Sequence, residues 1–429
     1  RRLAQRHDVT LATVVGGPAD RAAVAALAEL GVAIRTWPIS PARRAAAMAG
    51  AAMAGLPLQA RFDWQPALAA DLRALVAPPG RGAGSDRGAS PAPLGDARAP
   101  GAFDAVHVEH LRGAAYGLVL RGAAPGLPVV WDAVDCIARL FAQAARAAAT
   151  PRARLIARLE LARTRRYEAR LPARFAATAV TSAADRDALR ALAGAPSARP
   201  VADDRQAPGA AEPPIAVVPN GVDLERFAPP DGGPPARDPD TVLFTGKLGY
   251  HANVAAALHL VQDVMPLVWA RRPGARVVLA GAAPAPAVRA LARPAGASAG
   301  AVVVTGEVPD LRPHLVAAAV VAVPLVYGVG IQNKVLEAMA CAAPVVASPD
   351  AAAALAAVPG RDLLLGATPA ELAAAVVALL DDPARAAAVG AAGRAYVERA
   401  HGWDAAVARF EALYGARTAP AQGLAKGAD

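Results

Sequence analysis

The chain has 429 residues, more than one ordinary hydrophobic core accommodates, so its length predicts two domains. Hydrophobic residues make up 55% of it and charged residues 19%, a balance that excludes an intrinsically disordered protein. The 45 lysines and arginines exceed the 36 acidic residues and give a net charge of +9, which favours an anionic partner: a nucleotide diphosphate, an anionic membrane surface or a nucleic acid. Aromatic residues are only 4% and are not interleaved with basic ones, so nucleic acid is the weakest of these partners.

The chain begins without a methionine, and its first residues are typical of the last turns of a helix that leads into a strand. We therefore expect a fragment in which a first strand and the loop after it are missing. Short valine-rich runs then alternate with longer segments of helical period, a pattern that indicates parallel strands buried on both faces. In the first part of the chain, strands are predicted at 8–15, 32–37, 105–110, 127–132, 177–182 and 215–220.

A second series of strands is predicted at 241–246, 275–281, 301–306, 320–325 and 344–348. Between the two series, the proline- and glycine-rich stretch 228–240 suits neither helix nor sheet, so we place the domain boundary there. Two further low-complexity stretches are predicted to be flexible insertions in the first domain. The expected organisation is an N-terminal domain at 1–228 with insertions at 78–101 and 194–214, a C-terminal domain at 241–400, and a helix at 401–418 that crosses back to the first domain.

Neither the cysteines nor the apolar runs predict a metal site or a membrane span. Cys136 and Cys341 fit no metal-binding or redox spacing, and two isolated thiols favour a reducing compartment, hence the cytoplasm. The longest uncharged run, 313–333, contains Pro324 and two glycines, so it is interpreted as a buried strand and a turn.

The strongest local signal is the segment GVGIQNKVLEAMACAAPVV at 328–346. Gly328 and Gly330 predict a turn after a strand, and the residues from Gln332 onward have helical period. A glycine turn that feeds a helix N-terminus presents backbone N–H groups and the positive end of the helix dipole, a natural phosphate site. Lys334 in the first turn and Glu337 one turn later would serve a diphosphate and the ribose attached to it. The alternative is an ordinary loop-to-helix junction with a solvated lysine and glutamate.

Five motifs in order resemble the family 4 retaining glycosyltransferases, closest to the exosortase- and exopolysaccharide-associated bacterial sugar transferases. Besides GIQNKVLEAMA, they are IAVVPNGVDLERF (215–227), VLFTGKLGYHANVAAALHLVQDVMPLV (242–268), VVLAG (277–281) and VVVTGEVPDLRPHLVAAAVVAVPL (302–325). The resemblance covers nearly all of 103–415. It implies an α/β protein of the GT-B fold, in which two Rossmann-like domains with parallel sheets face a central cleft and the C-terminal domain binds the nucleotide-sugar donor.

By this resemblance, Glu337 binds the ribose of the donor, Val308 contacts the base through its backbone, and Lys247 is directed at the diphosphate. The remaining donor-binding residues belong to the turn and the start of the helix: Gly330, Ile331, Gln332, Asn333 and Lys334. Two positions depart from the family pattern, because Val329 replaces a glutamate and Ala252 a lysine. Lys334 would supply the positive charge lost at the second of them.

In the N-terminal domain, Glu109, His110 and Asp132 are the candidate catalytic residues, with His107 and Asp135 nearby. They follow predicted strands, and ligands of open α/β sheets bind outside the carboxyl ends of the strands. Glu109 aligns with a family histidine that approaches the acceptor or the transferred sugar. The alternative is that these polar groups only cap helices.

The predicted function is therefore transfer of a sugar, with retention of configuration, to an exopolysaccharide or lipid-linked glycan acceptor. No metal and no cofactor are expected. The basic helix predicted within 151–175 would hold an anionic membrane surface, which would make a cytoplasmic protein peripheral at the inner face of the cell membrane; an ordinary exposed helix is the alternative. The other functions considered are a GT-B nucleotide-sugar epimerase, a phosphorylase and a catalytically inactive GT-B-like scaffold.

Overall fold

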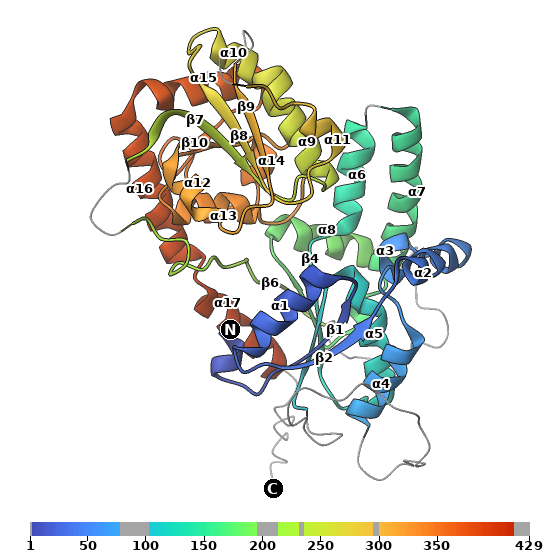
Figure 1. Cartoon of the computed structure of the whole chain (residues 1–429). Helices are drawn as coiled ribbons and strands as arrows, with labels where there is room; N and C mark the ends of the chain where they lie inside the picture. Colours follow the sequence, from blue (N-terminus) through green and yellow to red (C-terminus); the bar gives the residue numbers. More distant parts are fainter. Residues whose placement is uncertain are drawn as a thin grey trace, which may run out of the picture. The chain divides into compact units, whose positions relative to one another are not determined.

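Figure 1 shows the computed structural model of the chain, which describes residues 2–77, 103–148, 150–194, 213–230, 236–294 and 300–415. The expected insertions at 78–101 and 194–214 lie outside the described residues, apart from 194, 213 and 214. The chain divides into two compact units. Unit 1 comprises Arg1–Ala142, Thr150–Val218 and Val407–Asp429, and unit 2 comprises Gln143–Ala149 and Pro219–Ala406.

The strands of unit 1 form two parallel sheets. β1 (Thr10–Val15) pairs with β2 (Ala33–Pro38), and the other sheet has the order β3 (Val106–Glu109), β4 (Val129–Val134), β5 (Ala177–Val180) and β6 (Ile215–Val217). The helices are α1 (Pro18–Ala28), α2 (Pro41–Met53), α3 (Leu58–Arg61), α4 (Pro66–Val76), α5 (His110–Ala123), α7 (Pro151–Glu168) and α8 (Ala183–Ala193), with 3-10 turns at Leu3–Gln5 and Pro172–Arg174. Helix α6 (Ile137–Ala147) begins in unit 1, and its residues from Gln143 onward belong to unit 2.

The core of unit 1 lies against β4 and β5. All residues of β5 are buried, and the fully buried ring of Trp131 on β4 packs 5.7 Å from the ring of Phe175. Strands buried to this extent need apolar side chains on both faces, which is why they appear in the sequence as continuous rather than alternating apolar runs.

Unit 2 contains one six-stranded parallel sheet with the order β12-β11-β10-β7-β8-β9. Its strands are β7 (Asp238–Thr245), β8 (Arg276–Ala280), β9 (Val302–Gly306), β10 (Ala318–Val323), β11 (Val345–Ala347) and β12 (Leu364–Leu365). Its helices are α9 (His251–His259), α10 (Met265–Trp269), α11 (Pro286–Arg289), α12 (Arg312–Ala317), α13 (Asn333–Ala340), α14 (Pro349–Ala352), α15 (Pro369–Asp381) and α16 (Pro383–Ala400), with a π-helical turn at Leu260–Val264; α17 (Trp403–Gly415) begins in unit 2 and ends in unit 1. Counted from β7, the strand order is that of a doubly wound nucleotide-binding sheet, whose winding reverses between β7 and β10.

All eleven segments predicted as strands contain a strand. β6 ends at Val217, so the PNGVD segment that follows lies outside the sheet and in unit 2. β12 was not predicted, because a strand of two residues has no periodicity to detect.

Candidate functional site

Two loops at the carboxyl ends of neighbouring strands form the strongest candidate site. Gly246 and Lys247 follow β7, and the glycine turn that leads into α13 follows β10. β7 and β10 are hydrogen-bonded neighbours at the point where the winding of the sheet reverses. Ligands of open parallel sheets bind outside the strands at such a switch point. The topology of unit 2 therefore brings the predicted diphosphate-binding residues to the edge of the sheet where ligands bind.

The loop after β7 requires glycine because other backbone and side-chain atoms lie against it. Gly246 has a φ of 148°, and a Cβ there would lie 2.9 Å from Nδ2 of Asn253. A Cβ on Gly281, which follows β8, would overlap the carbonyl oxygen of Gly246. Because Gly246 and Gly281 have no side chains, the loops after β7 and β8 approach each other closely. Asn253 on α9 packs against the loop after β7.

Lys334 lies in the first turn of α13, where two amide side chains bind its ammonium group. Nζ donates to Oδ1 of Asn253 (3.0 Å) and to Oε1 of Gln332 (3.2 Å), and it lies 5.9 Å from the centre of the Phe244 ring. Burial lowers the pKa of Lys334 to about 8, while the nearby carboxylate of Glu337 acts in the opposite direction. A partly desolvated cation beside the positive end of a helix favours an anionic ligand.

Asn253 links the two loops, although it was not among the residues predicted from the sequence. Its Nδ2 donates to the carbonyl oxygen of Lys247 (3.1 Å), while its Oδ1 accepts from Lys334. The side chain is well buried, with the residue only 7% exposed. Asn253 lies within the segment 242–268 that resembles the family, but only the fold shows that its side chain contacts Lys334 and the backbone of Lys247.

The N-terminus of α13 is held by the side chains around it. Gly330 has a φ of 64°, and Gln332, the N-cap residue, makes no capping bond with its side chain. Instead Nε2 of Gln332 donates to the carbonyl oxygen of Val329 (3.0 Å), and Oδ1 of Asn333 accepts from Nδ2 of Asn220 (3.0 Å). The first amides of a helix have no partner within it, so an anion at this turn would meet N–H donors and the positive dipole end.

The remaining predicted donor residues lie at different depths. Glu337 is partly buried on α13, and burial raises the pKa of its carboxyl group against the opposing effects of Lys334 and Arg226. Lys247 is exposed in the loop after β7. Val308 is partly buried in the loop after β9, which β8 separates from β7 in the sheet.

In unit 1, the three candidate catalytic residues lie at the ends of two paired strands. Glu109 ends β3 and is exposed, and His110 begins α5 with a φ of 61°, an uncommon backbone conformation for a residue other than glycine. Burial lowers the pKa of His110 to about 4, with Arg112 acting in the same direction and Asp132 against it, so its imidazole is neutral at pH 7. Nδ1 of His110 is buried without a hydrogen-bond partner among the described residues.

Asp132 on β4 is bound from two sides. Its Oδ1 accepts from the backbone N–H of Val134 (3.0 Å), and its Oδ2 lies 3.5 Å from Nε2 of His107. Nδ1 of His107 lies 2.9 Å from the hydroxyl of Tyr414, near the end of α17. Asp132 thus bonds the end of β4 and lies beside the ring of His107.

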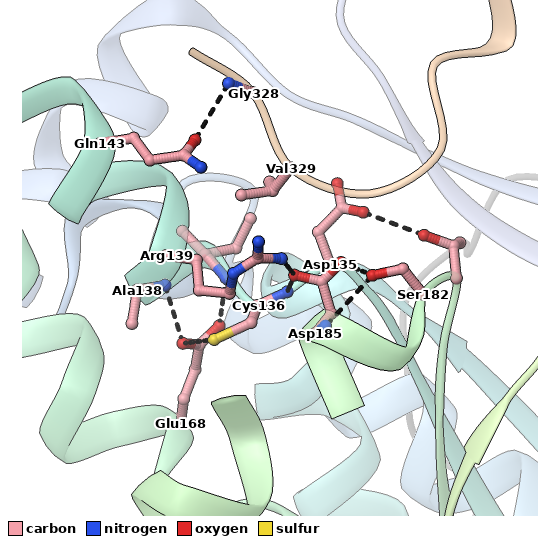
Figure 2. A network of polar contacts seen from close by, with 12 residues as sticks. Asp135, Cys136, Ala138, Arg139, Gln143, Glu168, Ser182, Asp185, Gly328 and Val329 are labelled. Atoms are coloured by element: carbon pink, nitrogen blue, oxygen red, sulfur yellow. Dashed lines mark hydrogen bonds and ion pairs between the residues drawn. The ribbon is translucent and has the colours of Figure 1, made fainter. Parts of the chain in front are cut away.

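Buried carboxylates beside β4 form the polar network of Figure 2. Asp135 accepts a hydrogen bond from Oγ1 of Thr181 (3.2 Å). Burial raises the pKa of Asp135 to about 7, and the negative charge of nearby Asp185 acts in the same direction. Asp185 accepts from Nη1 of Arg139 (2.7 Å) and the backbone N–H of Cys136 (3.2 Å). Glu168 and Asp185 were missed from the sequence, because they reach this network from α7 and α8 and belong to no motif.

The same view shows a backbone contact of the glycine turn in unit 2. The N–H of Gly328 donates to Oε1 of Gln143 (3.0 Å), and both residues belong to unit 2. The turn before α13 therefore has a bound N–H at its first glycine.

No group of three or more histidine, cysteine, aspartate or glutamate side chains lies close enough together to hold a metal ion in the part of the chain that the structure describes. Within those residues there is also no helix both long and apolar enough to span a membrane.

Comparison with known sequences gives a family match within unit 2. Residues 239–382, which include every donor-binding residue predicted above, match the family model described as glycosyl transferases group 1. The GDP-mannose-dependent monoacylated alpha-(1-6)-phosphatidylinositol monomannoside mannosyltransferase of Corynebacterium glutamicum is 34% identical over 210 residues. These are 44% of this chain and 52% of that protein, so the match spans about half the length of the curated relative.

Comparison with solved structures identifies the fold. Anabaena Alr3699/HepE in complex with UDP and glucose has a TM-score of 0.59 at 13% identity, over 95% of this chain and 99% of that one. Sucrose-phosphate synthase from Thermosynechococcus elongatus has a TM-score of 0.57 at 17% identity, over 95% of this chain and 98% of that one. The alpha,alpha-trehalose 6-phosphate synthase from Burkholderia multivorans has a TM-score of 0.60 at 13% identity, over 99% of this chain and 100% of that one. The chain thus has the GT-B fold, and the predicted fold class is confirmed.

Proposed function

We propose that this protein is a glycosyltransferase that moves a hexosyl group from a nucleotide-sugar donor to an acceptor with retention of anomeric configuration. The observation that carries the proposal is the position of Lys334, a partly buried cation at a helix N-terminus beside the switch point of the sheet. The match of 239–382 to glycosyl transferases group 1 supports it, as do the named mannosyltransferase and the UDP complex among the similar proteins.

Each predicted donor residue has a distinct role in the proposal. Lys334 and Lys247 neutralise the diphosphate, Glu337 binds the ribose, and the backbone of Val308 contacts the base. The backbone amides of Gly330, Ile331, Gln332 and Asn333 face the diphosphate oxygens. The side chains of Gln332 and Asn333 also shape the turn.

The proposed transfer uses no metal ion, because the two lysines and the helix dipole would stabilise the charge of the departing diphosphate. The bond between the anomeric carbon and the diphosphate oxygen breaks, and the acceptor oxygen bonds to the same face of that carbon. The acceptor proton leaves with the diphosphate. Of the unit 1 residues, Glu109 and neutral His110 would contact the acceptor or the transferred sugar, and Asp132 would position His107.

For the acceptor we propose an exopolysaccharide or lipid-linked glycan, and for the specific branch the exosortase-associated sugar transferases. The proposed location is the cytoplasm, with the protein peripheral at the inner face of the cell membrane. The motif GIQNKVLEAMA supports the branch, and the acceptor class follows from it.

A thermal-shift panel of UDP-, GDP- and ADP-linked sugars tests donor binding, because a ligand stabilises the folded state in proportion to the logarithm of its concentration over Kd. Transfer is then measured with the donor that binds. We expect Lys334→Ala to lower turnover roughly a hundredfold, the effect of removing one group that stabilises developing charge, with an unchanged melting temperature. Unchanged turnover would contradict the proposal.

Two alternatives give different outcomes in the same assays. An epimerase would release free nucleotide and an altered sugar in the absence of any acceptor. An inactive scaffold, which the departure at Val329 favours, would bind no nucleotide diphosphate at all.

A further inference from the structure

Helix α7 presents three large apolar side chains to solvent. Leu155, Ile156 and Leu159 are 59%, 52% and 53% exposed. An amphipathic helix normally turns such residues toward the core, but the buried side of α7 carries Ala157 and polar residues instead. Contiguous exposed apolar residues indicate a surface that a partner covers. We call Leu155, Ile156 and Leu159 the apolar ridge.

The orientation of α7 is fixed by its two glutamates, both buried. Glu160 accepts from the backbone N–H of Leu58 at the start of α3 (2.9 Å). Glu168 accepts from the backbone N–H groups of Ile137 and Ala138 at the start of α6 (2.8 and 2.9 Å). Each carboxylate caps the N-terminus of another helix. Rotating α7 to bury the ridge would break both caps, so the ridge stays outside.

Because both acidic residues of α7 point inward, its exposed side carries only positive charge. Arg163 is bound to Glu160 (2.9 Å) and is half-buried. The exposed arginines lie on and beside the apolar ridge along the whole helix: Arg152, Arg154, Arg158, Arg165 and Arg166.

We infer that the exposed side of α7 is a docking surface for an anionic lipid bilayer, with the apolar ridge inserted at the headgroup boundary and the arginines on lipid phosphates. Apolar residues flanked by basic ones are the pattern of helices that lie in a membrane interface. A second copy of this helix would set arginines against arginines, so charge favours a lipid surface over self-association. The inference deepens the proposed function by naming where a lipid-linked acceptor is met, but it rests on α7 and not on the donor site.

Co-sedimentation of the full chain with vesicles tests the inference. We expect binding to vesicles of phosphatidylcholine with phosphatidylglycerol and at least tenfold weaker binding to phosphatidylcholine alone. Replacing the ridge (L155S, I156S and L159S together) should weaken binding to the anionic vesicles at least tenfold. Replacing four arginines (R152Q, R158Q, R165Q and R166Q) should abolish the preference for anionic lipid, since each basic residue near such a surface contributes about fivefold.

The matched control replaces two similarly exposed apolar residues of unit 2, Leu267 and Val303, by serine, which should leave vesicle binding unchanged. Thermal shift with the nucleotide sugar keeps the two proposals separate, because loss of the ridge should leave donor binding intact. Equal binding to both kinds of vesicle, equal binding by the ridge variant, or no vesicle binding would each overturn the inference. So would a concentration-dependent dimer that the ridge variant loses, because the ridge would then be a contact between copies.

Discussion

The ammonium group of Lys334 lies 3.0 Å from Oδ1 of Asn253, and the same asparagine donates to the backbone of Lys247 (3.1 Å). One neutral side chain thus joins the two loops that carry the proposed diphosphate-binding cations. An amide orients a lysine without neutralising it, so the charge remains for a ligand. This arrangement makes Asn253 a positioning residue of the proposed donor site.

Replacing Asn253 should therefore weaken diphosphate binding more than it weakens the fold. We expect Asn253→Ala to lower the affinity for UDP or GDP roughly tenfold, the equivalent of about 1.4 kcal/mol, because Lys334 loses its orienting hydrogen bond. Asn253→Asp should weaken it at least as much, since the new carboxylate would pair with Lys334. Isothermal calorimetry measures both. Gln262→Ala, an exposed change on the following turn, is the control; equal affinity in all four proteins would rule out the positioning role.

Diphosphate binding should also depend on pH above neutrality. With a pKa of about 8, Lys334 is charged at pH 7 and loses its proton as the pH rises through 8 in the ligand-free protein. Only the charged form attracts the diphosphate, so affinity should fall between pH 7 and pH 9. Lys334→Gln should bind weakly at every pH and show no such fall. A wild-type affinity that stays constant to pH 9 would contradict this role of Lys334.

The loops around the site should not tolerate a side chain at Gly281. Its φ is 149°, and a Cβ would overlap the carbonyl oxygen of Gly246, so Gly281→Ala must push the ends of β7 and β8 apart. We expect it to lower the free energy of unfolding by about 3 kcal/mol or more. Gly360→Ala is the matched control, because its φ of 83° is also positive but no atom lies within 4 Å of the added Cβ; strain alone should cost it about 1 kcal/mol. Urea unfolding measures both, and equal losses would show that the close approach is unimportant.

Buried Glu168 should make the stability of the protein depend on pH. Burial raises the pKa of its carboxyl group from 4.5 to about 7, against the opposing effect of the N–H groups of Ala138 and Ile137. Between these two values the folded state holds a proton that the unfolded state has released. The stability from the neutral acid is therefore fully present below pH 4.5 and is lost as the pH rises to 7, an effect on the order of 3 kcal/mol.

Glu168→Gln, which stays neutral, tests this dependence. The stability advantage of the variant over the wild type should be larger at pH 8 than at pH 5. Thermal unfolding of both proteins at both pH values measures it. Asp135, whose pKa is also raised to about 7, titrates in the same range, so Asp135→Asn provides the comparison. If Glu168→Gln left the pH dependence of the melting temperature unchanged, the wild-type carboxyl group would be charged in the folded protein.

The sequence by itself determined the fold class and the place of the glycine turn before α13. Valine-rich runs such as 241–246 and 320–325 mark strands buried on both faces, because such strands cannot alternate with polar residues. The glycine turn and Lys334 lie close together in the chain, so the local pattern was enough to predict a turn that leads into a helix with a lysine in its first turn. The two-residue β12 carried no such signal.

Only the tertiary structure decided which residues meet across the chain. Asn253 reaches Lys334, and Glu168 reaches the start of α6, through contacts whose partners are far apart in sequence and follow no period. The outward side of α7 was likewise undetermined, because its leucines and its glutamates both recur at helical spacing. The capping bonds of Glu160 and Glu168 decide which side faces outward. Leaving a buried carboxylate without N–H partners costs more free energy than leaving a leucine exposed to solvent.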